Sequence, residues 1–279
     1  MRLIQHHGRA ALVTPDGIAD LERASGGRLP PDPMAALARL GELRELAAKG
    51  VSATAPLPDD AELGPPVPRP SKVFGIGLNY RDHAAEAGLE LPKQPLVFTK
   101  FPSCIVGPRA DVPLSGDRVD YEAELVAVIG ERCHHVREAD ARRVIAGFCA
   151  GQDVSDRRLQ FADKPPQFSL GKSFDGYGPI GPAIVSLDEL ERPGDLAITC
   201  DVSGERYQDG RTSQMIFPVE ELVAFLSRVC TLLPGDLIFT GTPAGVGSAR
   251  EPRRYLVPGD VIETTVEGVG RLRNRCVAP

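Results

Sequence analysis

The chain has 279 residues, of which 42% are hydrophobic and 25% charged, an ordinary composition for a soluble globular protein of one large or two smaller domains. Its 32 basic and 38 acidic side chains give a formal charge of −6, and no basic block is present, so nucleic-acid binding is not expected. Tryptophan is absent and no window approaches a membrane span, so we expect neither a base-stacking surface nor a membrane protein.

Cysteine usage and the N-terminus both favour a cytoplasmic location. The six cysteines form no C-x-x-C pair, and several lie within apolar runs, which is typical of reduced core thiols. The first residues lack the long apolar stretch of a signal peptide. We therefore expect a cytoplasmic protein without disulfides.

Residues 1–55 are predicted to form a small α+β domain. A strand pair is expected around Gly8, and leucines at every third position predict a helix from residue 34 to 49. The proline-rich residues 56–70 suit neither a helix nor an inner strand, so they are predicted to link this domain to a main domain, residues 71–279. The sequence places no acid or cysteine near the two histidines at 6 and 7, so no metal site is expected there.

The main domain opens with a predicted strand at residues 72–78. The strand contains G-x-G without the third glycine of a dinucleotide-binding fingerprint, so that function is rejected. If Asn79 caps the short helix that follows, His83 and Glu86 lie on one face, where the carboxylate would raise the basicity of the imidazole and fix its tautomer. The spacing is compatible with a catalytic dyad or with a surface ion pair.

Acidic residues mark the start of a second predicted strand, residues 120–130. Glu122 and Glu124 point to the same face of this strand, roughly 7 Å apart. A third carboxylate, Asp153, follows another apolar run. Three such oxygen ligands suit Mg²⁺, Mn²⁺ or Ca²⁺ and suit zinc poorly, whereas a solvated acidic edge is the alternative.

Four further polar residues are candidates for binding or polarising a substrate. Ser155 can cap a short helix in which Arg157 and Gln160 share a face, although an ion-paired arginine would also fit. Lys172 stands between glycine and apolar residues, which suggests a cleft, where a lysine can form a Schiff base or stabilise an oxyanion. Thr242 lies in a glycine-rich turn that can hold a carboxylate or can be a simple β-turn.

From about residue 72 to the C-terminus, these motifs and their order resemble the fumarylacetoacetate hydrolase family. The resemblance rests on five motifs: D-Y-E-A-E-L at 120–125, D-V-S at 153–155, G-K-S-F-D at 171–175, P-G-D at 234–236, and the run from T-G-T-P at 240–243 to G-V-G at 245–247. It implies an α+β, β-rich fold whose catalytic domain is a mixed β-sandwich roll, in a homodimer. It also implies that residues 79–95 form a lid over the bound ligand.

The resemblance implies a divalent-metal-dependent hydrolase that cleaves a C–C bond of an acylpyruvate-like substrate, a small anionic 2-oxo acid with a second carbonyl, through a metal-bound enolate. Decarboxylation of an oxaloacetate-like β-keto acid, and hydration or isomerisation of a 2-oxo dienoic acid, are alternatives at the same site. A non-catalytic ligand-binding protein is a rival that has no need of a general base. Asp156, Arg158 and Gln152 depart from the commoner family pattern and leave the substrate open.

The implied roles divide into three groups. His83, Glu86 and Lys172 are catalytic; Arg157, Gln160 and Thr242 bind the substrate; Glu122, Glu124 and Asp153 hold Mg²⁺ or Mn²⁺, with Ca²⁺ as a further ion that fits.

Overall fold

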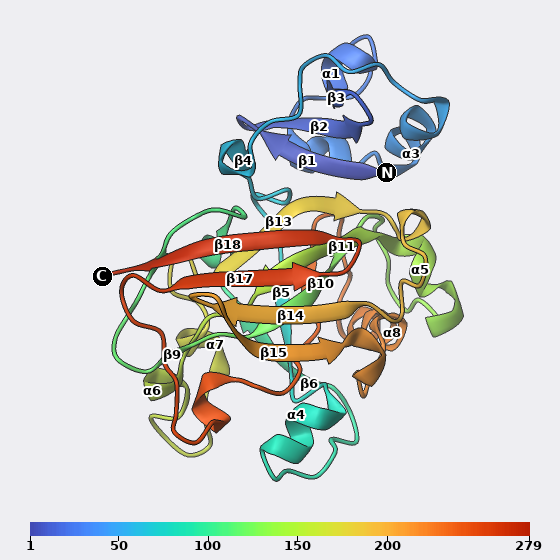
Figure 1. Ribbon diagram of the computed structural model, residues 1–279. Helices are drawn as coiled ribbons and strands as arrows, with labels where there is room; N and C mark the ends of the chain where they lie inside the picture. The colour runs from blue at the N-terminus through green and yellow to red at the C-terminus, as the bar shows by residue number, and fades with distance from the viewer.

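The computed structural model describes residues 1–279, and a small N-terminal unit lies at one end of a larger β-rich body (Figure 1). The strands of the N-terminal unit are β1 (Arg2–His6), β2 (Arg9–Thr14) and β3 (Gly17–Asp20), and its helices are α1 (Leu21–Ala24), α2 (Pro33–Leu37) and α3 (Leu40–Lys49). The expected strand pair around Gly8 is confirmed, because β1 and β2 are antiparallel neighbours. The third strand was not predicted.

The helix predicted over residues 34–49 is wrong as a single element, because it is divided between α2 and α3. An apolar residue at every third position drifts around an α-helix, which has 3.6 residues per turn. The break at Ala38 and Arg39 resets the register, so that the leucines on both sides are buried: Leu37, Leu40, Leu43 and Leu46.

The N-terminal unit is joined to the main body by hydrogen-bonded strands as well as by the linker. β1 pairs antiparallel with β13 (Gly178–Val185), with Leu3 opposite Ile184. The proline-rich stretch supplies the short strand β4 (Leu63–Gly64), which pairs with β1. The division into two domains at residues 56–70 stays a prediction.

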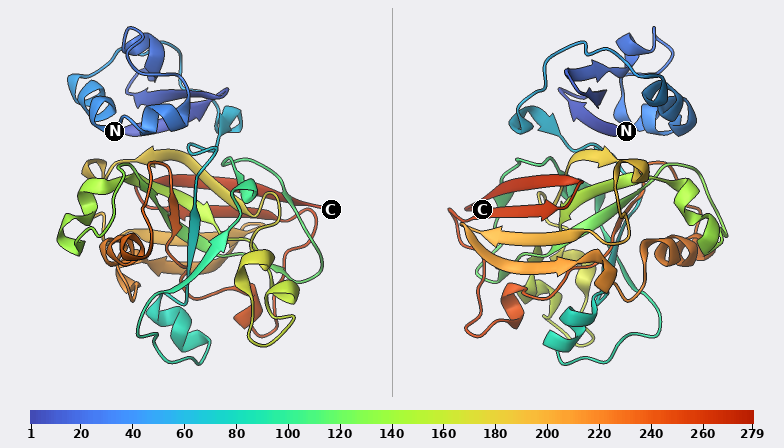
Figure 2. Two further views of the ribbon diagram at one scale, coloured as in Figure 1. Left: turned by 180° about the vertical axis from the view of Figure 1, so that it is seen from behind. Right: turned by 45° about the vertical axis from the view of Figure 1, so that its right-hand side comes forward.

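Two packed sheets form the main body, as the two further views make clear (Figure 2). An 11-stranded sheet has the order β3-β2-β1-β13-β11-β10-β16-β5-β6, with β4 and β7 beside it, and a five-stranded sheet has the order β15-β14-β17-β18-β8. β10, β11 and β13 of the first sheet contact β14, β17 and β18 of the second. This α+β, β-rich architecture is the expected fold class.

The remaining strands are β5 (Val73–Gly77), β6 (Leu96–Lys100), β7 (Ile105–Val106), β8 (Val112–Pro113), β9 (Val119–Asp120), β10 (Ala123–Ile129), β11 (Ile145–Gln152), β12 (Ser155–Asp156), β14 (Ala197–Val202), β15 (Glu205–Arg211), β16 (Leu237–Phe239), β17 (Val261–Val266) and β18 (Gly270–Val277). The remaining α-helices are α4 (Arg81–Glu86), α5 (Ala141–Val144), α6 (Arg157–Gln160), α7 (Phe168–Gly171) and α8 (Val219–Val229). Six 3₁₀ turns lie at Asp60–Glu62, Pro102–Cys104, Glu138–Asp140, Leu187–Glu189, Thr212–Gln214 and Gly247–Ala249. No helix has the length and hydropathy needed to cross a membrane.

The centre of the large sheet brings the acidic motifs together. β10 and β11 are antiparallel neighbours, and every residue in them is buried. Their register places Glu124 opposite Gly151, and the amide of Asp153 donates to the carbonyl of Glu122 at 2.9 Å. Two acidic motifs that are separate in sequence thus meet at one end of this strand pair.

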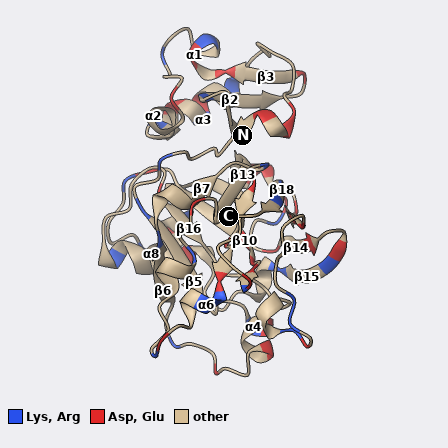
Figure 3. Cartoon of the chain, turned by 90° about the vertical axis from the view of Figure 1, so that its left-hand side faces the viewer, with Lys and Arg blue, Asp and Glu red and all other residues tan.

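Charged residues are interspersed over the surface and do not gather into one basic face (Figure 3). This distribution agrees with the formal charge of −6. It gives no support to a nucleic-acid-binding surface.

Candidate active site

Three buried carboxylates form the centre of the site. Glu122 precedes β10, Glu124 lies on it and Asp153 follows β11. Each side chain offers an oxygen within 4.8 Å of those of the other two. The sequence-based grouping of these acids therefore agrees with their positions, although strand pairing, and not one continuous strand over residues 120–130, brings them together.

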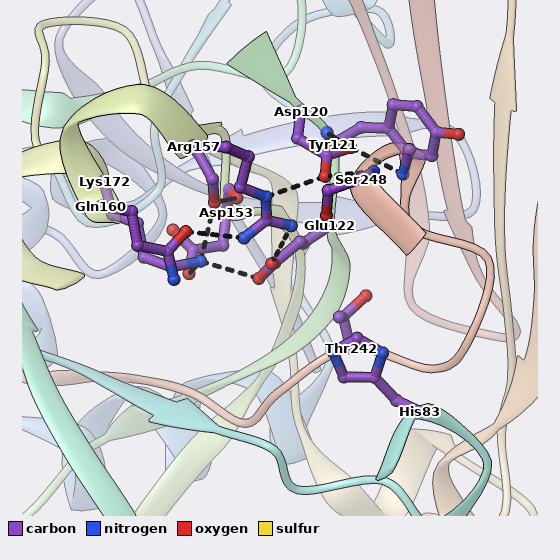
Figure 4. Close-up of polar contacts among 12 residues, drawn as sticks. His83, Asp120, Tyr121, Glu122, Asp153, Arg157, Gln160, Lys172, Thr242 and Ser248 are labelled. Carbon is purple, nitrogen blue, oxygen red and sulfur yellow. Dashed lines mark hydrogen bonds and ion pairs between the residues drawn. The ribbon is translucent and has the colours of Figure 1, made fainter. Parts of the chain in front are cut away.

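Two buried lysines, Lys172 (Figure 4) and Lys100, contact this cluster. Lys172 Nζ donates to Glu122 Oε2 at 2.8 Å, to Asp153 Oδ2 at 2.8 Å and to Ser155 Oγ at 2.7 Å. Lys100 Nζ donates to the other oxygen of Asp153 at 2.5 Å. Burial alone would lower the pKa of Lys100, but the charge and hydrogen bond of Asp153, together with the nearby Cys104 and Glu124, outweigh it, and the net direction is upward.

Lys100 is a site residue that the sequence analysis missed. A lysine at the end of β6 resembles a solvated strand end, yet its side chain is almost completely buried. Besides Asp153, its ammonium bonds the carbonyl oxygens of Lys172 and Tyr177. The one available signal was its position at the end of an apolar strand, and that position does not distinguish a buried lysine from a solvent-exposed one.

The three carboxylates differ in their electrostatic surroundings. Burial alone would raise the pKa of Glu122, but Lys172 and Arg157 reverse this effect and lower it to about 2. Glu124 has one hydrogen bond, from the amide of Gly241 at 2.8 Å, and no cationic side chain pairs with it. Burial, followed by the charges of Asp153 and Glu122, holds the pKa of Glu124 well above its ordinary range.

This asymmetry fits a divalent cation. Three anionic oxygens in close reach are the ligands that Mg²⁺ and Mn²⁺ prefer. A buried carboxylate without a cationic partner is costly, and a bound ion would supply the charge that Glu124 lacks. The residues present therefore fit the expected metal.

The His83–Glu86 pair on α4 borders the same cavity as Glu122. His83 Nδ1 is 3.2 Å from Glu86 Oε2, and the other oxygen of Glu86 accepts from the amide of Gly245 at 2.9 Å. The side chains are 16% and 22% exposed, so the pair is accessible yet largely shielded. The expected i,i+3 contact is therefore present, with the carboxylate fixed by a distant loop.

The expected cap at Asn79 is wrong. The helix begins after Tyr80 without a side-chain cap, and the Asn79 amide instead donates to the carbonyls of Phe217 and Thr240. Its side-chain oxygen accepts from Phe217 N at 2.9 Å. Asn79 is completely buried, so it fixes the base of α4 against the core and does not begin a surface turn.

The expected cap at Ser155 is also wrong, because Asp156 caps α6 by accepting from the amide of Leu159. On this helix, Arg157 Nη2 donates to Glu122 at 2.6 Å and its Nη1 donates to Gln160 Oε1 at 2.8 Å. Its Nε donates to Asp120 at 2.8 Å, and Asp120 also accepts from the amides of Gly247 and Ser248. Asp120 is a second site residue that the sequence analysis did not assign.

Thr242 also borders the cavity, but its hydroxyl is already bonded. The hydroxyl donates to the carbonyl of Ala123 at 2.8 Å and accepts from Gln208 Nε2 at 2.7 Å. Its proton is therefore committed within the protein. A role of Thr242 in binding substrate stays a prediction, and in this geometry its hydroxyl can only accept from a ligand.

The cavity at this site has a volume of about 700 Å³, within the range of small-molecule sites. Its polar wall combines the dyad with the cationic and acidic groups described above. The lining is Ile76, Gly77, Leu78, His83, Glu86, Ala87, Leu89, Leu96, Phe98, Arg118, Glu122, Arg157, Gln160, Phe161, Pro166, Phe168, Lys172, Thr242, Val246, Ser248, Ala249, Arg253 and Tyr255.

Away from this site, the histidines at the β1–β2 turn have an acidic neighbour that the sequence did not place near them. Glu62 Oε1 lies 3.6 Å from His7 Nε2. His6, His7 and Glu62 are partly or fully exposed, and their ligand atoms lie within 4.8 Å of one another. The expectation that no acid lies near these histidines is therefore wrong, because the linker folds back onto the β1–β2 turn.

Comparison with known proteins gives the same family as the motifs. The family model described as fumarylacetoacetate (FAA) hydrolase C-terminal matches residues 72–277. Human mitochondrial oxaloacetate tautomerase FAHD2A is 44% identical over 214 residues, which cover 76% of this chain and 68% of that protein.

Two solved structures extend the likeness over the whole chain. A Mycobacterium smegmatis crystal structure is 46% identical with a TM-score of 0.95, and the match covers 100% of this chain and 99% of the other. The maleylpyruvate hydrolase of Sphingobium sp. SYK-6, crystallised with manganese(II) and pyruvate, is 30% identical with a TM-score of 0.80, covering 100% and 99%. The chain belongs to the fumarylacetoacetate hydrolase family.

Proposed function

We propose that this enzyme is a divalent-metal-dependent hydrolase that cleaves the C–C bond of an acylpyruvate-like 2-oxo acid. The observation that carries the proposal is the His83–Glu86 pair, which borders the same cavity as Glu122 and Lys172. A general base is required to activate water, and the carboxylate cluster fits the cation that such a substrate would chelate. The manganese and pyruvate bound by the Sphingobium relative support this choice.

Glu122, Glu124 and Asp153 would hold Mg²⁺ or Mn²⁺, with Ca²⁺ also compatible with the oxygen ligands. When bound, the ion would supply Lewis-acid stabilisation of negative charge that develops on the substrate. Arg157 and Lys172 keep Glu122 ionised, since their charges lower its pKa. Arg157, Gln160 and Thr242 border the cavity and are proposed to position the substrate.

His83 is proposed to remove a proton from water while Glu86 orients the ring through Nδ1. The resulting hydroxide adds to the distal carbonyl, and the bond to C3 of the pyruvate unit breaks with its electron pair remaining on that carbon. A proton then reaches C3, which yields a carboxylate and pyruvate. Lys172 uses all three N–H groups on anionic or hydroxyl oxygens, so its role is electrostatic and not nucleophilic.

Tautomerisation of oxaloacetate is a second candidate, favoured by the 44% identity to the human tautomerase. It needs proton transfer between carbon and oxygen, for which the same dyad is suited. Decarboxylation of an oxaloacetate-like acid, and hydration or isomerisation of a 2-oxo dienoic acid, are further reactions that a stabilised enolate permits. Decarboxylation needs no attacking water, so it does not require the His83–Glu86 pair as a water-activating base.

The test is a panel of acetylpyruvate, oxaloacetate and a 2-oxo dienoic acid, each assayed with Mg²⁺ and Mn²⁺. We expect acetylpyruvate cleavage, and His83→Ala and Glu86→Ala should each lower kcat by about 10²–10⁴-fold. The double variant should be little worse, because the pair acts as a unit. His134→Ala, an exposed histidine away from the cavity, is the matched control.

Two results would replace this proposal. Full turnover of acetylpyruvate by both single variants would remove the water-activating dyad. Consumption of oxaloacetate alone, unaffected by the variants, would favour decarboxylation. A homodimer and a cytoplasmic location are also proposed, and sedimentation and cell fractionation respectively test them.

A further inference from the structure

Two adjacent histidines and a glutamate converge where the linker folds back onto the N-terminal hairpin. His6 ends β1, His7 lies in the β1–β2 turn, and Glu62 ends the 3₁₀ turn of the linker. Each of the three offers one ligand atom, and these atoms lie within 4.8 Å of one another. This hairpin cluster shares no residue with the active-site cavity or with its three carboxylates.

The backbone fixes the spacing of the hairpin cluster. β4 pairs antiparallel with β1, with His6 opposite Leu63, and Glu62 immediately precedes that partner (Figure 1). His7 has a φ of +47°, in the left-handed region, and the centre of its ring lies 4.1 Å from that of His6. The turn therefore holds both imidazoles side by side, next to the linker.

Glu62 has one oxygen bonded within the linker and one oxygen directed at the hairpin. Its Oε2 accepts from the amide of Asp59 at 3.1 Å, as part of a capping box. Its Oε1 lies 3.6 Å from His7 Nε2, which is longer than a hydrogen bond. No lysine or arginine forms a salt bridge with this carboxylate. The second oxygen is thus close to the imidazole without being bonded to it.

These distances suit a single bound ion. Ligand atoms that each lie about 2.0–2.2 Å from a zinc ion are at most about 4.3 Å apart, and the 3.6 Å between His7 and Glu62 is within that limit. The side chains of His7 and Glu62 are 66% and 47% exposed, so they are free to rotate towards the third ligand. Imidazole ligands suit Zn²⁺, Ni²⁺ and Cu²⁺, whereas the all-oxygen active-site cluster suits Mg²⁺ and Mn²⁺.

We propose that His6, His7 and Glu62 form a second metal site, which binds Zn²⁺ or another divalent ion that prefers imidazole and completes its coordination with water. Because the ligands come from the hairpin and from the linker, the bound ion holds the linker against the N-terminal unit. This reverses the expectation from the sequence, which rested on the absence of a nearby acid.

The chain contains a matched control for this site. His134 and His135 are also adjacent and exposed, the second has a φ of +52°, and their ring centres lie 4.2 Å apart. No acidic or cysteine side chain joins this pair in a group of three ligands. Affinity that arises from two neighbouring histidines alone should therefore be equal at the two pairs.

The first test is calorimetry with Zn²⁺ on the full chain without an affinity tag, in excess Mg²⁺ so that the active-site carboxylates do not compete for Zn²⁺. Glu62→Gln, His7→Asn and His6→Gln should each weaken Zn²⁺ binding by about ten-fold or more. Glutamine keeps the capping box and asparagine tolerates the left-handed backbone, so these variants remove ligands without disturbing the turn.

The double variant His134→Asn/His135→Asn should bind Zn²⁺ as tightly as the native protein. An equal loss in that double variant, or unchanged affinity in the variants of the hairpin cluster, would overturn the site. A loss in both histidine variants with full affinity in Glu62→Gln would also overturn it, because the linker would then contribute no ligand.

The second test asks whether the ion holds the linker. Hydrogen exchange followed by mass spectrometry should slow over residues 59–64 when Zn²⁺ is added to the native protein, since this segment carries Glu62 and the Gly64 amide that donates to Gln5 Oε1 at 3.1 Å. Glu62→Gln should show no such slowing. Tight Zn²⁺ binding without slower exchange in the native protein, or equal slowing in Glu62→Gln, would contradict the proposed link.

Discussion

The amide of Gly245 donates a hydrogen bond of 2.9 Å to the carboxylate of Glu86, across a sequence separation of 159 residues. This contact ties the C-terminal glycine-rich loop to the helix that carries His83. The position requires glycine, because its φ is +106° and an added Cβ would lie 2.0 Å from the carbonyl oxygen of Tyr207.

Gly245→Ala should therefore damage both stability and the dyad. Gly259→Ala is the matched control, with φ of +98° and no atom within 4 Å of an added Cβ. The free energy of unfolding of the control should fall by about 1–2 kcal/mol from backbone strain alone, and its turnover should be unchanged. Gly245→Ala should lose more, and kcat of the folded fraction should fall towards that of Glu86→Ala. Urea unfolding and steady-state kinetics measure the two effects, and equal behaviour of the two variants would contradict this role.

Each of the three proposed metal ligands should be required for metal binding. Glu122→Gln, Glu124→Gln and Asp153→Asn should each abolish Mg²⁺ and Mn²⁺ binding in calorimetry, because each removes one of three hard anionic ligands. Glu131→Gln, at an exposed position beyond β10, should bind normally. Unchanged affinity in all three ligand variants would remove the metal site.

In the metal-free protein, Asp153→Asn should lower the free energy of unfolding by about 3–5 kcal/mol, since it leaves two buried lysines without their shared anion. Glu124→Gln should cost little or stabilise, because it removes a buried charge with no cationic partner. Chemical unfolding in chelator compares the two variants. A larger loss in Glu124→Gln than in Asp153→Asn would contradict this charge assignment.

The cysteines should be free and protected. All six are unpaired, and five of them are buried, while Cys230 is half-buried. Burial raises the pKa of the Cys276 thiol to about 12 and also raises that of the Cys149 thiol. Ellman's reagent should thus react slowly with native protein and should count six thiols in denaturant without reductant. Two or more disulfides in that count would contradict reduced thiols.

Asp260 should contribute a pH-dependent part of the stability. Burial opposes its ionisation, but hydrogen bonds from Val257 and Arg254 outweigh this and lower its pKa below the ordinary aspartate value of 3.8. A carboxyl whose folded-state pKa is lowered stabilises the fold above the unfolded-state pKa, and the contribution is lost as pH falls through the folded-state value. Asp260→Asn should cost about 1–3 kcal/mol near pH 7 and progressively less below pH 3.8.

Unfolding free energies of the native protein and Asp260→Asn, measured between pH 2.5 and 7, test this pH dependence. Asp209→Asn, at an exposed position, should show no comparable change. A difference for Asp260→Asn that stays constant with pH would contradict the assigned ionisation.

Local sequence motifs predicted much of the candidate site. The motifs implied the α+β, β-rich fold through their resemblance to a known family, and the acids near positions 122 and 153 sufficed to group the three carboxylates. The i,i+3 spacing also predicted the contact between His83 and Glu86, because helix geometry depends on neighbours in sequence.

Tertiary structure decided the electrostatics. Lys100, Lys172 and Asp153 come from three separate segments, and no local pattern reports that both ammonium groups meet one carboxylate. The caps at Asn79 and Ser155 were mispredicted for the same reason, since long-range partners compete for their side chains. Local periodicity records which face of an element is apolar, whereas charge pairing depends on which segments the completed sheet places side by side.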